Sequence, residues 1–581
     1  MERSAPVASS DEIDLYVRTY YSLLRSTGEV RVRAFEEAHA FSLSSLHPGA
    51  LAPTPDVSAF AYAAARLPDE MLQTKLVVLG QSHELFEAVG FDVRAWKTAR
   101  TRGRRRPLRF DADTSTLGVF IASESDIDDF IPILTAYQIE WNKMHERLRA
   151  LGKDADFVMP DNAKLAELLS VTEDELGILH EAFTGARFEQ SLRELARRPS
   201  DVNVRMLAAS YSQYQRAAQR WWGEVEPAYV SPTPPRRGPV YFVSSNTHAI
   251  ANLVGGYARA NTQAILDYAR EKDPQGLSEA IERATSDGVE ADVLPLVYFF
   301  LRGFLHATPG KERIRAVREF EKQVGVVHIS EPGHIDVDAQ IIDLAKVDPE
   351  LIDPRLRVNG IELLAKSDAR IVNIDYPLGM AAYHLLSRLG QGVGELRGVY
   401  VMGKAATLNG RVGDVCLSGT VYDEHTQNTF LFRNCFSARD VRPFLKHGSV
   451  FDNQSALTVR SAFLQNKHYM NAFYRDGYTV LEMEAGPFLS AIYELVNPTR
   501  VPQKEIVHLS ASTPFDVGIL HYASDTPYSR RQSLLSKSLS YFGVDSTYAS
   551  AIAIVRRIFD QEVTRLSRRG ASPTPTMPPP A

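Results

Sequence analysis

The sequence predicts an α/β protein in which a helix-rich N-terminal part precedes a C-terminal domain built on a mixed, mainly parallel sheet. Short apolar runs typical of buried strands alternate with helical segments along the chain. Helical periodicity fills residues 126–222 and 260–322 almost without interruption. From Val324 onwards strand signals become dense. This alternation indicates a sheet with helices on both of its faces.

Three apolar runs in the N-terminal part are predicted strands, and each is followed by polar residues that can begin a helix. The runs are residues 75–80, 117–122 and 240–243, followed by Gln81-Ser82-His83, Ser123-Glu124-Ser125 and Ser244-Ser245-Asn246-Thr247. Ser and Asn are preferred N-caps, and helix N-termini also attract anions. Residues 1–322 are therefore expected to form a regulatory or lid domain. Whether its strand ends bind an anionic ligand or only cap helices stays open.

The second domain is expected over residues 323–568, with a Pro-rich, disordered tail at 569–581. Its predicted elements are strands at 325–329, 399–402, 414–417, 421–422, 478–484 and 518–522, a hairpin over 360–374, and a helix at 545–562. In sheets of this class ligands bind at the carboxyl ends of the strands. The polar residues at those ends are therefore the candidates for function.

Composition excludes several classes of protein. The net charge of −6 and the pI near 6.2 require no nucleic-acid partner. Cys416 and Cys435 do not have the spacing of a metal site, and His83, His248 and His334 lack a spaced partner, so neither a metal nor a cofactor is expected. No apolar leader or membrane-length run is found, which favours a cytoplasmic protein without a membrane partner.

Three polar segments follow predicted strands of the second domain. Gly403-Lys404 combines close backbone approach with a charge suited to phosphate. Glu482 and Glu484 share one face of a strand, where a carboxylate can accept both hydroxyl protons of a ribose diol. Ser524-Asp525 places a possible general acid at the rim of the sheet. Taken singly, these segments could equally be a tight turn, solvated glutamates and a capped turn.

In this order and context the three segments resemble the nucleoside phosphorylase/nucleosidase superfamily. Residues 482–485 are similar to its E-M-E-[AG] motif, and residues 523–525 are similar to its [IV]-S-D element. The resemblance extends over about residues 324–562, and residues 371–379, 403–408 and 459–463 are similar to weaker motifs. The layout is most similar to that of the bacterial AMP nucleosidases, which also carry a long N-terminal regulatory domain.

The resemblance implies a three-layer αβα catalytic domain that cleaves the N-glycosidic bond of a purine nucleoside or nucleotide. In that reaction Asp525 would protonate the leaving base, and Glu484 would hold the ribose diol. The other implied site residues are Glu331 as a base, Met483 and Glu482 at the sugar, Phe463 at the base, Ser524 beside the acid, and Gly403, Lys404 and Gly379 on the side of the anion or water. A homo-oligomer is also implied.

The chain departs from the family pattern on the side of the nucleophile. Lys404 replaces a small hydroxyl residue, Ala406-Thr407 replaces a glycine pair, and Asp375-Tyr376 lies where the family has Ser-Gly. Three activities therefore stay open. They are a nucleosidase that uses water, a phosphorylase that uses phosphate, and a non-catalytic nucleotide sensor.

Overall fold

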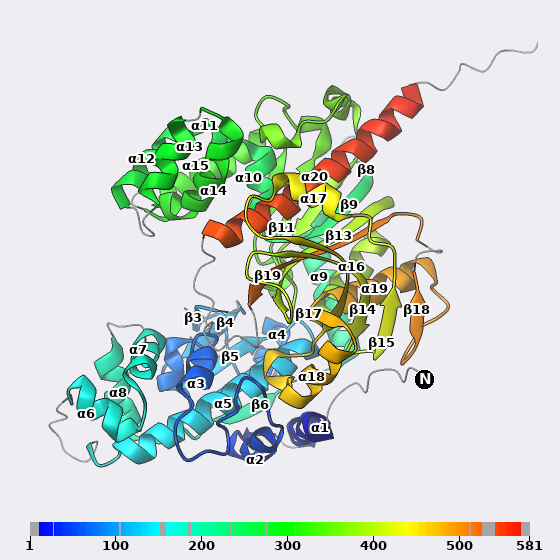
Figure 1. Cartoon of the computed structure of the whole chain (residues 1–581). Helices are drawn as coiled ribbons and strands as arrows, with labels where there is room; N and C mark the ends of the chain where they lie inside the picture. Colours follow the sequence, from blue (N-terminus) through cyan, green and yellow to red (C-terminus); the bar gives the residue numbers. More distant parts are fainter. Residues whose placement is uncertain are drawn as a thin grey trace, which may run out of the picture.

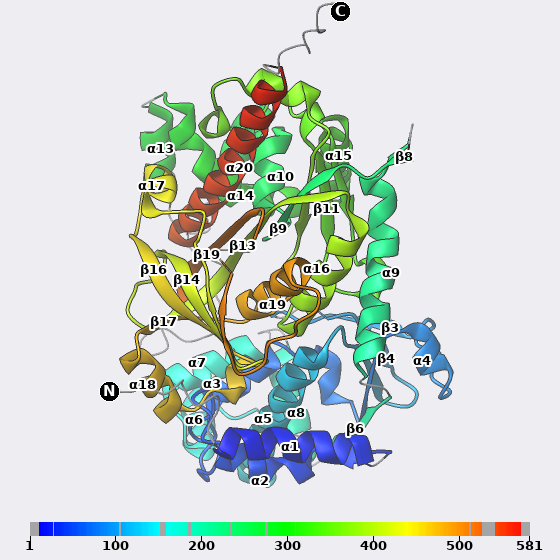
Figure 2. The same cartoon turned by 90° about the vertical axis from the view of Figure 1, so that its right-hand side faces the viewer.

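The computed structural model of the chain describes residues 11–570 except 27, 104–105, 152–158, 184–186, 208–209, 233–234, 273–276, 287, 308–309, 510–512 and 526–540. The described residues form two units, each with its own sheet (Figures 1 and 2). The small unit, residues 11–206, is the blue and cyan part of both figures. The large unit, residues 211–570, contains the rest.

The small unit is a sheet with helices packed around it. Within the described residues its six strands, in spatial order, are β1 (Val30–Arg31), β6 (Asn203–Met206), β2 (Leu76–Gly80), β5 (Thr116–Phe120), β4 (Leu108–Asp111) and β3 (Lys97–Ala99). Strand β2 runs parallel to both β5 and β6, so these three strands share one carboxyl edge. The described helices are α1 (Asp11–Ser26), α2 (Arg33–Phe41), α3 (Val57–Ala64), α4 (His83–Glu87), α5 (Glu124–Leu148), α6 (Asn162–Leu169), α7 (Glu173–Ala182) and α8 (Phe188–Arg197). The predicted strands at 75–80 and 117–122 are confirmed as β2 and β5.

The large unit contains a mixed sheet. Among the described residues, its strands follow the order β10 (Val326–Ile329), β11 (Ala339–Asp343), β12 (Arg370–Ile374), β9 (Pro239–Ser244), β13 (Glu395–Thr407), β17 (Tyr478–Glu482), β16 (Val450–Thr458), β14 (Val415–Asp423), β15 (Asn428–Leu431) and β18 (Ile506–His508). Strand β19 (Asp516–Asp525) lies off this path and pairs with both β13 and β14. Strands β13, β19, β14, β16 and β17 therefore close into a ring.

Helices cover both faces of this sheet, as the sequence predicts. In β9, Val240 and Phe242 pack with α9 (Tyr211–Tyr229), α16 (Met380–Gly392) and α19 (Ala485–Val496). Tyr241 and Val243 point to the opposite face, because successive strand side chains alternate. That face packs against α10 (Ala249–Gly255), α14 (Glu290–His306) and α20 (Tyr541–Gly570), as Figure 2 shows for α20. The remaining described helices are α11 (Tyr257–Ala260), α12 (Thr262–Lys272), α13 (Ser278–Ser286), α15 (Gly310–Gln323), α17 (Ala438–Val441) and α18 (Lys467–Arg475).

The expected boundary at residue 322 is wrong. Strand β9 lies between β12 and β13 in the middle of the large sheet, and both pairings are parallel. Helices α10 to α15 are therefore an insertion between β9 and β10, and the two units meet between β6 and α9. A fragment that ends at residue 322 would separate β9 from both of its neighbours.

Three predicted elements also differ from the structure. Residues 360–374 are not a hairpin, because residues 361–366 form a 3₁₀ helix and only β12 is a strand. Strand β13 continues to Thr407 rather than ending at Gly403, since both of its edges are paired. The two strands expected at 414–417 and 421–422 are the single strand β14.

Candidate functional site

The first glutamate of the E-M-E segment is bonded within the protein. Glu482 is the last residue of β17, and its side chain is buried. Its Oε2 accepts the backbone N–H groups of Glu484 and Ala485, each at 2.7 Å, so it caps the start of α19. Thr458, its register partner on β16, donates a further hydrogen bond to Oε1. Burial raises the pKa of Glu482 to about 7.

The second glutamate has a different environment. Glu484 directly precedes α19 and is only partly buried. Met483, between the two glutamates, is partly buried against the cluster around Tyr422 and Phe473. The two glutamates of the E-M-E segment therefore differ in burial.

The Ser-Asp segment reaches the same part of the sheet from the other side of β13. Ala406 of β13 has Leu481 as its register partner on β17 and Asp525 as its partner on β19. Asp525 is the last residue of β19, and its side chain lies outside the part of the structure that is described. Ser524 is partly buried, with its Oγ 3.4 Å from the carbonyl oxygen of Ala405. The two motifs, about 40 residues apart in sequence, therefore flank one residue.

Gly403 and Lys404 lie inside β13 rather than at its end. Gly403 is opposite His521 of β19, and a Cβ on Gly403 would be 3.5 Å from the imidazole Cδ2. His521 is fully buried, and its Nε2 lies 3.7 Å from Oε2 of Glu482. Burial lowers the pKa of His521 to about 4, so the ring is neutral at pH 7. Lys404 is exposed.

Three further residues that were predicted for the site either lie away from the E-M-E segment or have a structural role. Gly379 has a φ of 50° just before α16, and a Cβ there would be 2.2 Å from Oγ of Ser125. Phe463 is buried in the core of the small unit, where its ring lies 5.3 Å from that of Tyr62. Glu331 is exposed and follows β10, which three strands separate from β13. At roughly 4.8 Å per strand, Glu331 is too distant to share a site with β13.

A polar cluster that the sequence pattern does not single out lies where the two units meet. Oγ of Ser125, in the first turn of α5, lies 3.1 Å from Nε2 of His425, whose Nδ1 lies 2.8 Å from Oδ1 of Asp423. Burial alone would lower the pKa of His425, but the carboxylate of Asp423 outweighs burial and raises it. The Asp-x-His spacing at the end of β14 was the available signal. A spacing of two residues is too common to single out.

A family model covers most of the chain. It matches residues 32–560 and is described as a family of unknown function, DUF6909.

The chain belongs to this family.

Solved structures similar to this DUF6909 member include enzymes that act on nucleosides. One is a 5′-methylthioadenosine/S-adenosylhomocysteine nucleosidase from Neisseria meningitidis, with 14% identity over 42% of this chain and 94% of that chain and a TM-score of 0.28. Another is a uridine phosphorylase from Vibrio fischeri ES114, with 9% identity over 43% and 88% of the two chains and a TM-score of 0.28. A uridine phosphorylase from Schistosoma mansoni has 11% identity over 34% and 72%, with a TM-score of 0.24. No curated protein matches the chain.

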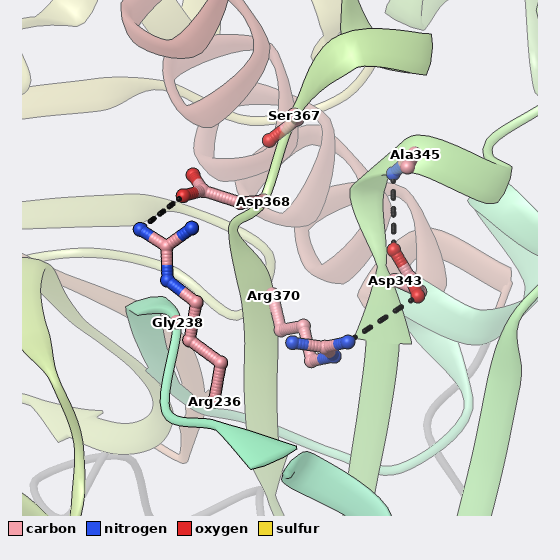
Figure 3. Close-up of a pocket in the computed structure, with 7 residues that line it drawn as sticks. All are labelled: Arg236, Gly238, Asp343, Ala345, Ser367, Asp368 and Arg370. Carbon is pink, nitrogen blue, oxygen red and sulfur yellow. Dashed lines mark hydrogen bonds and ion pairs between the residues drawn. The ribbon is translucent and has the colours of Figure 1, made fainter. Parts of the chain in front are cut away.

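A surface cavity of about 230 Å³ lies at the opposite edge of the large sheet of this DUF6909 member (Figure 3). It opens where β9 and β12 begin, whereas the E-M-E segment lies beside Ala406, close to the end of β13, which runs parallel to β9. Arg236 lies 3.3 Å from Asp368, and Arg370 lies 3.7 Å from Asp343, so the arginines that line it are paired with carboxylates. This cavity is therefore separate from the candidate site.

The described part of this family member contains no cluster of His, Cys, Asp and Glu arranged to hold a metal ion. His83 packs against Phe120 at 5.1 Å between ring centroids, and the side chain of His334 lies outside the description. No described helix is both long and apolar enough to cross a membrane.

Proposed function

We propose that the chain cleaves the N-glycosidic bond of a purine nucleoside or nucleotide, with water as the nucleophile. The observation that carries this proposal is the register around Ala406, which has the E-M-E strand on one side and Asp525 on the other. A glycosidase requires such a pairing, because the sugar and its leaving group must be contacted at the same time.

In this mechanism Asp525 protonates the leaving base while the C1′–N bond breaks. Glu484 accepts hydrogen bonds from the two ribose hydroxyls and lies close to the positive charge that develops on the sugar. Met483 packs on the sugar. Water supplies the oxygen that bonds to C1′, and the proton that it loses balances the proton donated by Asp525.

The capping role of Glu482 supports the assignment of ribose binding to Glu484. Its buried carboxylate already accepts two backbone N–H groups and one hydroxyl, so it has little capacity left for a substrate. Its contribution is to fix the start of α19, and thereby the position of Glu484. Glu331 and Phe463 have no part in this mechanism, because each lies away from the register around Ala406.

Phosphorolysis is the second candidate, and the exposed ammonium group of Lys404 on β13 favours it. The deciding experiment incubates the purified full-length chain with a panel of nucleosides and nucleotides, with and without inorganic phosphate, and measures the free base. Release without phosphate is expected. Release only with phosphate would establish a phosphorylase, and binding without release would establish a sensor.

A further inference from the structure

The small unit is joined to the large unit through a buried hydroxyl. Ser125 of α5 is fully buried, and its Oγ accepts the backbone N–H of Met380 at 2.9 Å. Met380 is the first residue of α16, so the hydroxyl satisfies one of the N–H groups that a helix start leaves unpaired. The glycine before it, Gly379, permits this approach because any side chain would collide with Ser125.

The same hydroxyl contacts His425, which Asp423 holds in place. Asp423 is fully buried and also accepts hydrogen bonds from the hydroxyl of Thr426 at 2.7 Å and from the N–H of His425 at 3.1 Å. Serine, histidine and aspartate follow one another here as in a hydrolase triad. A nucleophile must be reachable by its substrate, however, and Ser125 is fully buried and occupied by Met380. The contacts of Ser125 with Met380 and His425 therefore hold the two units together.

The cluster borders the candidate site. Asp423, Thr458 and Glu482 are successive register partners across β14, β16 and β17. A Cβ on Gly486, in the first turn of α19, would be 2.5 Å from Cβ of Asp423. The side chain that anchors His425 thus packs against the helix whose start carries Glu484.

Other polar contacts between the units surround this cluster. Asp128, three residues after Ser125, is fully buried and receives a hydrogen bond at 3.1 Å from Nε of Arg460. Ser123 approaches the carbonyl oxygen of Leu378 at 3.5 Å. Beside these polar contacts, Phe463 and Leu464 of the large unit are buried in the core of the small unit, so the interface also has an apolar part.

We propose that Ser125, His425 and Asp423 form a latch, and that the small unit is a lid whose release admits substrate to the candidate site. The access step rests on the function proposed above. The latch itself does not, because it is defined by contacts between the units. Opening breaks the bonds of Ser125 to Met380 and His425 and the contact of Asp128 with Arg460, and it withdraws Phe463 from the core of the small unit. The pair of His425 and Asp423 stays in the large unit.

The test compares Ser125→Ala with Ser26→Ala, a control that removes an exposed hydroxyl at the end of α1 in the same unit. Amide hydrogen exchange at Met380 and across residues 423–426 is expected to rise about tenfold or more in Ser125→Ala, as the loss of one to two net hydrogen bonds predicts. The radius of gyration measured by X-ray scattering is expected to increase. Ser26→Ala should match the wild type in both.

Unchanged exchange and scattering in Ser125→Ala would overturn the latch, whatever the enzymatic activity. If Ser125→Ala does not fold, His425→Asn provides the same comparison, because its shorter side chain no longer reaches Ser125. In a wild type that cleaves nucleosides, a released latch should change kcat/KM for adenosine at least threefold. Faster exchange with an unchanged kcat/KM would overturn the role as a lid. A wild type that cleaves no nucleoside would contradict the proposed function only.

Discussion

Polar residues follow the strands at the carboxyl edges of both sheets, but their roles in the two units differ. In the small unit Ser82 accepts a hydrogen bond from the N–H of Leu85, Ser123 is part of a capping box, and Ser125 binds the large unit. In the large unit Glu482 caps α19, and Glu484, the residue before that helix, is partly buried. A polar residue at a strand end is therefore not by itself evidence for a ligand.

This comparison explains why the strand ends at residues 81–83, 123–125 and 244–247 do not by themselves indicate an anion site. Asn246, the third example, accepts the N–H of Ala249 at 2.6 Å and caps α10. Ser245 is bonded to Asn373 at 2.7 Å. Ser82, Ser123, Ser125, Ser245 and Asn246 therefore all bond to other groups of the protein.

The largest expected effect concerns Asp525 at the edge of the large sheet. Asp525→Asn should fold normally and lose about 10²–10⁴-fold in kcat, because an amide cannot donate the proton that the leaving base needs. Steady-state release of base and the circular dichroism spectrum are the measurements. Turnover close to that of the wild type would remove Asp525 from the mechanism.

The second effect concerns ribose recognition. Glu484→Gln should lower kcat/KM for ribonucleosides by roughly 10- to 150-fold, as a loss of about 1.5–3 kcal/mol in charged hydrogen bonds predicts. The matched substrate is the 2′-deoxynucleoside, for which the loss should be smaller. Equal rates on both substrates in wild type and variant would show that Glu484 does not hold the diol.

The third effect tests the assignment of Glu482 to the fold. Its pKa rises from 4.5 to about 7 on folding, so the folded state binds the proton more tightly. The stability that this provides is present at low pH and is lost as pH rises from about 4.5 to about 7. The melting temperature of Glu482→Gln should therefore fall less steeply than that of the wild type across this window. Parallel curves would contradict the assignment.

The smallest effect concerns the edge of the small sheet. Ser82→Ala should lower the free energy of unfolding by about 1 kcal/mol, because it removes the N-cap of α4. Its kcat and KM should equal those of the wild type. Urea unfolding together with steady-state kinetics measures both quantities. A change in KM would mean that this edge does contact a ligand.

Much of the local structure could be predicted from the sequence. The apolar residues 76–80, 117–120 and 240–243 all lie in strands, namely β2, β5 and β9. The start of α5 could be predicted because Ser123 is a preferred N-cap residue, and in the structure it forms a capping box with Asp126. The 3₁₀ helix at residues 361–366 was missed because short apolar segments fit a strand equally well.

The sequence by itself determined several of the buried strands, where several helices begin, and which residues carry the E-M-E and Ser-Asp motifs. These features depend on residues close together along the chain. Only the tertiary structure decided that β9 belongs to the large sheet, that Phe463 packs in the core of the small unit, and that Ser125 meets His425. Strand pairing and the contacts between the units join residues that are hundreds of positions apart. The sequence of a buried strand does not specify which strand pairs with it. The same limit applies to the two glutamates, which differ in burial although they lie two residues apart.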